Sequence, residues 1–88
     1  MAFAYADKYG LLHVVDKKAM AEQYAKPGTK VVQTIVDSET GTPKINGQKV
    51  FVYLEEKEAY IGSNAKEGQP YKYQDNPVLM ALINEIGY

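Results

Sequence analysis

The sequence predicts an α+β domain in which a mainly antiparallel, five-stranded sheet carries two helices on one face. Strand-like segments follow one another in runs, in the order β-β-α-β-β-β-α, instead of alternating strictly with helices. Short connections between neighbouring segments favour hairpins, which join antiparallel strands. Residues 50–54, Val-Phe-Val-Tyr-Leu, are apolar on both faces, as expected of a strand that is covered on each side. The 88 residues suffice for a single domain, residues 1–88, with one modest core.

The first elements are predicted to be a hairpin and a helix. Residues 3–6 and 11–15 have strand-like patterns, and a four-residue turn over 7–10 separates them. Asp16 is a favourable N-cap for a helix over residues 17–25. The apolar stripe of this helix is expected to consist of Met20, Ala21, Tyr24 and Ala25.

The remaining strands are predicted in the middle of the chain, over residues 30–36, 50–54 and 58–62. The first of them has no cleanly apolar face, because Gln33 and Thr34 lie on opposite sides of it. Residues 37–44 are expected to form a polar loop. The pair Asn46-Gly47 is a strong turn signal just before the most apolar strand.

The last helix is the most apolar element of the chain. Asn76 is a good N-cap, Pro77 suits the first helical position, and Gly87 is a natural stop. Only Asn84 and Glu85 are polar within its body. Such a helix is either buried deeply or packed against a second chain, and so short a protein hardly allows deep burial. We therefore expect a homodimer whose self-interface includes Val78, Leu79, Met80 and Ile83.

Tyrosine is unusually abundant, with eight copies in the chain. Its apolar body and polar tip suit half-buried positions, so we interpret most copies as covering the edges of a thin core. A polar loop over residues 63–74 is expected to be ordered only if its tyrosines dock. With a neighbouring strand, this loop supplies a candidate surface for a small molecule or peptide, formed by Tyr60, Tyr71 and Tyr73.

Composition argues against several classes of function. The net charge is −1 and all ten basic residues are Lys, so nucleic-acid binding is not favoured. The absence of Cys excludes disulfides and thiolate metal sites. No stretch approaches the roughly 20 apolar residues of a membrane span. Residues 1–9 lack a basic segment followed by an apolar run, so we expect a cytoplasmic protein if Met1 is the native start.

The sequence contains no recognisable set of catalytic residues. His13 is the only histidine, and we interpret it as a hydrogen-bonded or half-exposed residue of a strand. Ser38 and Ser63 lie in predicted loops, outside the pattern of a nucleophile elbow. The acidic residues cluster only at residues 55–58, the tip of a predicted hairpin. We therefore predict a non-enzymatic interaction module without cofactor or metal, acting through self-association or, alternatively, through ligand binding.

Overall fold

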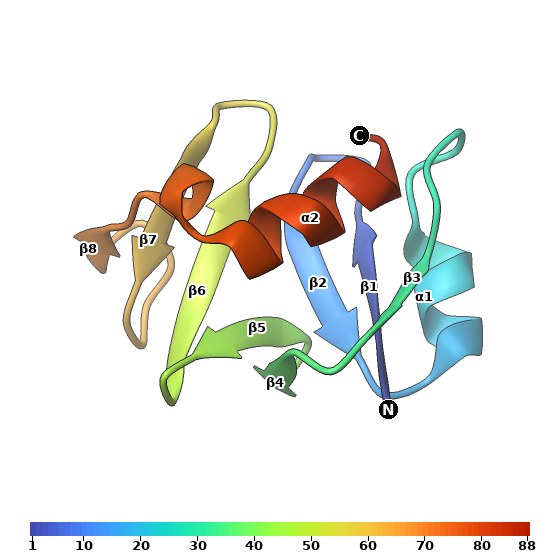
Figure 1. Ribbon diagram of the computed structural model, residues 1–88, viewed down its shortest axis with the longest axis horizontal. Helices are drawn as coiled ribbons and strands as arrows, with labels where there is room; N and C mark the ends of the chain where they lie inside the picture. The colour runs from blue at the N-terminus through green and yellow to red at the C-terminus, as the bar shows by residue number, and fades with distance from the viewer.

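The computed structural model describes residues 1–88 and confirms the α+β class with antiparallel sheets (Figure 1). The strands form two sheets, where the sequence predicted one five-stranded sheet. The first sheet has the order β2-β1-β3 and consists of β1 (Ala2–Ala6), β2 (Leu12–Val15) and β3 (Val32–Thr34). The second sheet follows chain order and consists of β4 (Asp37–Glu39), β5 (Thr42–Ile45), β6 (Gln48–Tyr53), β7 (Glu58–Ile61) and β8 (Gln69–Pro70). The helices are α1 (Lys18–Tyr24), the 3-10 turn η1 (Tyr73–Asp75) and α2 (Pro77–Ile86).

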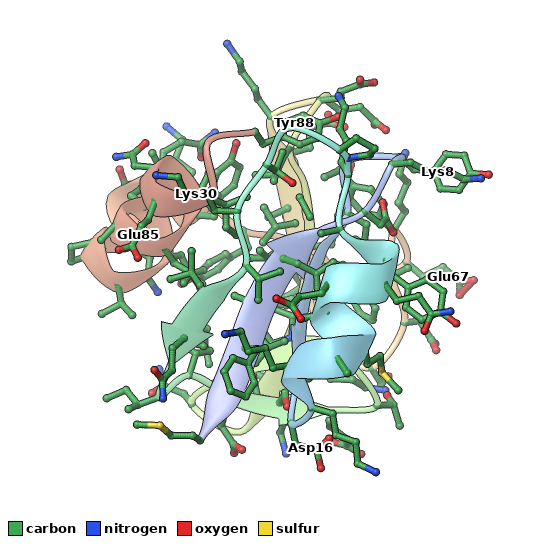
Figure 2. The ribbon with its side chains drawn as sticks, turned by 90° about the vertical axis from the view of Figure 1, so that its right-hand side faces the viewer. Lys8, Asp16, Lys30, Glu67, Glu85 and Tyr88 are labelled. Atoms are coloured by element: carbon green, nitrogen blue, oxygen red, sulfur yellow. The ribbon has the colours of Figure 1, made fainter.

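The two helices lie on opposite faces of the first sheet, and the prediction of one shared face is wrong. Figure 2 shows α1 and α2 on the two sides of β1. Ala4 and Ala6 of β1 are fully buried in the cluster that contains the buried side chains of α2, whereas Tyr5 belongs to a separate cluster with Ala21 of α1. The reason is that β1 alternates apolar residues on both faces, and one helix cannot cover both.

One main core joins the two sheets beneath α2, which crosses β6, β2 and β1 in Figure 1. The first sheet, the second sheet and α2 all contribute side chains to this core. Fully buried examples are Val14, Val50 and Leu79, one from each. The sheets also meet through the backbone of the first hairpin. The N–H of Val14 donates to the carbonyl of Gly41 at 3.0 Å, and the N–H of Leu54 donates to the carbonyl of Gly10 at 2.8 Å. The second sheet is therefore anchored to the first along β2.

The strand predicted over residues 50–54 is β6, and only one of its faces is fully buried. Val50 and Val52 are inaccessible to solvent, whereas Phe51 and Tyr53 are half-buried. The outer face is covered by side chains instead of a second layer. The ring of Tyr53 meets the ring of Tyr60 edge-on at 6.2 Å, and the Nζ of Lys66 lies 4.8 Å from the centre of the Tyr53 ring.

Residues 37–44 form the β4–β5 hairpin, where the sequence predicted a polar loop. Thr40 and Gly41 connect these strands with φ values of 51° and 82°, the left-handed conformation that two-residue hairpin turns use. The predicted Asn46-Gly47 turn has the same form, with φ values of 52° and 80°, and joins β5 to β6. The β4–β5 hairpin was not predicted, because the polar side chains of β4 show no alternation of apolar and polar residues.

Helix α1 is shorter and less buried than predicted. It begins at Lys18 without a side-chain cap, so Asp16 does not act as its N-cap. Of the predicted stripe, only Ala21 is buried, while Met20 and Tyr24 are 43% and 55% exposed. A helix of this length covers only a narrow strip of the sheet beneath it, which leaves space on either side.

Helix α2 has the ends that the sequence predicted. The side chain of Asn76 accepts hydrogen bonds from the N–H groups of Val78 and Leu79, at 3.0 and 3.1 Å. Gly87 has a φ of 73°, and its N–H donates to the carbonyl of Ile83 at 3.2 Å. Both ends therefore satisfy backbone groups that a helix otherwise leaves unpaired.

We expect Asn76→Ala to lower the free energy of unfolding by about 1–2 kcal/mol, because both N-cap hydrogen bonds are lost. Urea denaturation followed by circular dichroism measures the change. Asn84→Ala is the control, since Asn84 lies exposed on the same helix and should alter stability by less than about 0.5 kcal/mol. Equal effects of the two substitutions would contradict the proposed strength of the cap.

Candidate functional site

The structure brings together two of the three tyrosines of the predicted ligand surface. Tyr60 and Tyr71 line one hollow of about 480 Å³ beside β7 and β8, with charged side chains that include Lys72 and Asp75. Tyr73 is only 5% exposed and belongs to the main core. The predicted docking of the loop therefore occurs, but it removes one tyrosine from the surface.

The predicted self-interface on α2 is largely occupied within the chain. Leu79 is fully buried in the main core, and Met80 and Ile83 are half-buried against its edge. Val78 remains 57% exposed. Deep burial is not expected for a chain of this length, but it does occur along one side of α2.

The most exposed large apolar side chain lies beside an open sheet edge. Ile35 is 93% exposed and directly follows β3, which pairs with β1 on one side and has no strand on the other. Residues 31–36 read Val-Val-Gln-Thr-Ile-Val, without a charge or a proline. Edge strands usually carry such features, because an unprotected edge pairs readily with another chain.

A polar cluster that the sequence did not predict lies on the α1 side of the first hairpin. Tyr5 and His13 are cross-strand partners, and their rings stack with centres 4.9 Å apart and planes 15° apart. The Nε2 of His13 lies 2.7 Å from the Oδ2 of Asp7. The other carboxylate oxygen, Oδ1, accepts hydrogen bonds from the N–H groups of Tyr9 and Leu11 at 2.8 and 3.1 Å. The backbone thus fixes the carboxylate that orients the imidazole.

These contacts set the protonation of the cluster. Burial raises the pKa of Asp7, but the hydrogen bond from His13 and those from Leu11 and Tyr9 outweigh it, so the pKa lies below its ordinary value. Burial, followed by the charges of Asp7 and Tyr24, raises the pKa of Tyr5, which stays protonated at neutral pH. An ionised carboxylate can only accept a hydrogen bond, so His13 donates its Nε2–H to Asp7. In the neutral form of the imidazole, Nδ1 is then a hydrogen-bond acceptor.

The register of the first hairpin explains why this cluster was missed. A four-residue turn over residues 7–10 would place Tyr5 opposite Leu12. In the structure the N–H of Asp7 donates to the carbonyl of Leu11 at 3.0 Å, and Gly10 has a φ of 88°, so the loop holds three residues. His13 then faces Tyr5. The interpretation of His13 as a hydrogen-bonded strand residue agrees with this geometry.

Two hydroxyl side chains lie near His13 without contacting its imidazole. Ser38 and Thr40 line the same hollow as His13, but neither hydroxyl forms a hydrogen bond with its imidazole. No group of three or more His, Asp or Glu side chains is arranged to hold a metal ion. A nucleophile and its base are therefore not assembled around His13.

No protein-family model, characterised protein or solved structure matches this chain. No helix in it combines the length and the apolar character needed to cross a membrane.

We expect Asp7→Asn to lower the free energy of unfolding at pH 7 by about 1–3 kcal/mol, because three hydrogen bonds to a charged group are weakened. The folded pKa of Asp7 lies below its ordinary value of 3.8, so its contribution is present above that value and is lost as the pH falls through the folded pKa. The difference between wild type and variant should therefore shrink in acid.

Chemical denaturation at a series of pH values between about 2 and 7 measures this convergence. Glu85→Gln removes an exposed carboxylate from α2 and serves as the control. Stability curves of wild type and Asp7→Asn that run parallel across the whole range would contradict the assigned role of Asp7.

Proposed function

We propose that this chain is a non-enzymatic interaction module that forms a homodimer by antiparallel pairing of the β3 edges of two copies. The observation that carries the proposal is the exposure of Ile35, 93%, beside an uncharged and unpaired edge. An apolar side chain of this size gains about 1.5–3 kcal/mol when it is fully buried. A second copy would bury it twice, once in each subunit.

The backbone of this segment supports the same arrangement. The sequence pattern is strand-like over residues 30–36, but only Val32–Thr34 pair with β1. At its two ends, the N–H of Lys30 donates to the carbonyl of Ile86 at 2.9 Å and the N–H of Val36 donates to the hydroxyl of Thr34 at 3.1 Å. The edge left for a second copy therefore lies within residues 31–35. Addition of a strand at such an edge supplies main-chain hydrogen bonds, and two identical edges can supply them to each other about a two-fold axis.

The α2 surface is the alternative interface for the same dimer. Val78 is its exposed member, and Met80 and Ile83 are partly accessible beside it. We favour β3 because Leu79, one of the four residues of the predicted α2 interface, is fully buried inside the chain. The β3 edge also presents unpaired backbone groups, which α2 does not.

We expect the wild-type chain to have twice the 9.8 kDa mass of one copy when light scattering follows a sizing column. Ile35→Lys should reduce the mass to that of one copy across a dilution series, because a charge would be placed against its counterpart in the interface. The thermal midpoint extrapolated to low concentration should stay nearly unchanged, since Ile35 makes almost no contact within one copy.

Val78→Lys is the matched control, because it introduces the same charge at an exposed apolar position on α2. The dimer should persist in this variant. Dissociation by Val78→Lys but not by Ile35→Lys would move the interface to α2. A wild-type chain that is monomeric at every concentration would contradict self-association itself.

A second candidate function is ligand binding at the hollow that Tyr60 and Tyr71 share. The hydroxyl of Tyr71 accepts a hydrogen bond from the side-chain amide of Asn76 at 2.9 Å, so this ring is held in place. We expect a bound metabolite or short peptide to change the tyrosine fluorescence of the chain, and Tyr71→Ala should abolish that change. An unchanged spectrum across a panel of such compounds would count against this function.

A further inference from the structure

We infer that the groove beside His13, between α1 and the β4–β5 hairpin, binds a small aromatic amine in its cationic form. The hollow measures about 660 Å³, within the range of roughly 300–1,000 Å³ that small-molecule sites occupy. It is independent of the β3 edge and of the tyrosine hollow beside β8. Its principal lining residues are Tyr5, His13, Asp16, Met20, Tyr24 and Gly41.

The first feature is an oriented hydrogen-bond acceptor. Asp7 engages Nε2 of His13, and no protein group forms a hydrogen bond with Nδ1. Nδ1 faces the β4–β5 turn, since a Cβ built on Gly41 would lie 3.9 Å from it. Stacking on Tyr5 holds the ring in this orientation. A ligand hydroxyl or N–H can therefore donate to Nδ1 without any reorganisation of the imidazole.

The second feature is an apolar and aromatic wall that α1 leaves unfilled. Ala21 is the only buried residue of the helix, while Met20 and Tyr24 line the groove with 43% and 55% of their surfaces exposed. Tyrosine rings and a thioether pack well against an aromatic ring. A tyrosine face also attracts an ammonium group.

The third feature is the sign of the charge. Asp16 is the only formally charged residue that lines this hollow when His13 is neutral, and it forms no ion pair. Figure 2 places it at the N-terminal end of α1. The neighbouring Lys17 and Lys18 do not line the hollow. The ionised Asp7 behind His13 adds to the negative potential, so the groove favours a cation over an anion.

Together these features specify a ligand with an ammonium group for Asp16, a ring for Tyr24 and Met20, and a donor for His13. Tyramine carries all three and is the probe we choose. Phenethylamine lacks the hydroxyl, and 4-hydroxyphenylpropionate replaces the ammonium group by a carboxylate. These two compounds test the hydrogen bond and the charge separately.

Titration of the ¹⁵N-labelled full chain with tyramine, followed by NMR, tests the proposal. We expect saturable shifts of the amide signals of His13, Tyr24 and Gly41. Asp16→Asn should weaken binding about three- to fivefold, the loss expected for one exposed ion pair. Tyr24→Ala should weaken it by a similar factor through loss of the ring contact. Phenethylamine should bind less tightly than tyramine, and 4-hydroxyphenylpropionate should not bind.

Asp75→Asn removes a carboxylate that lines the tyrosine hollow beside β8 and should leave tyramine binding unchanged. Three results would overturn the proposal. One is the absence of shifts up to about 10 mM tyramine, a concentration that detects even millimolar affinity. Another is equal binding of the anionic analogue. The third is a set of shifts confined to residues around Tyr60 and Tyr71.

Discussion

Both helices depend on the alternation of side chains along β1. Ala4 and Ala6 point to one side and are fully buried, so α2 packs there against a surface of small side chains. Tyr5 points to the other side, where α1 supplies only Ala21 as a buried contact. The large residues on this second face need more cover than a short helix provides. The groove beside His13 is a direct consequence of that mismatch.

The position of His13 within the groove depends in turn on Asp7. Its carboxylate accepts two backbone hydrogen bonds within the hairpin loop and thereby favours the three-residue connection. A slip of one residue would turn the His13 side chain away from Tyr5 and towards the opposite face. The same carboxylate therefore selects the register and holds the imidazole that the register brings to it. The hydrogen bonds that form the turn therefore also determine the geometry of the site.

Local signals predicted the ends of α2 and the β5–β6 turn, but they misplaced the N-cap of α1 at Asp16 and the turn of the β1–β2 hairpin. The caps of α2 at Asn76 and Gly87 and the turn at Asn46-Gly47 each depend on a few neighbouring residues, and each has the predicted form. The β4–β5 hairpin escaped prediction because its polar strands are held by pairing with each other and by the bond between Val14 and Gly41. The pattern of apolar residues within the segment gives no sign of either interaction.

The site was harder to predict than the fold for a related reason. Tyr60 and Tyr71 share a hollow only because β8 pairs with β7, and Tyr73 turns inward because the core accepts it. The Asp7–His13 pair required the register of one hairpin to within one residue. The residue types indicated which side chains suit a surface. Which of these side chains lie together was decided by strand pairing, which the sequence did not predict.

The uncovered surfaces have a common physical origin in the length of the chain. In 88 residues, two sheets and one main core leave few residues to cover the second face of β1 or the free edge of β3. Burial of Ile35 by a second copy, or filling of the groove by a ligand, would add the contacts that the chain lacks. A partner that binds only the folded chain stabilises it in proportion to RT ln(1 + [L]/Kd). The two proposed interaction surfaces are therefore also surfaces at which binding would increase the stability of the domain.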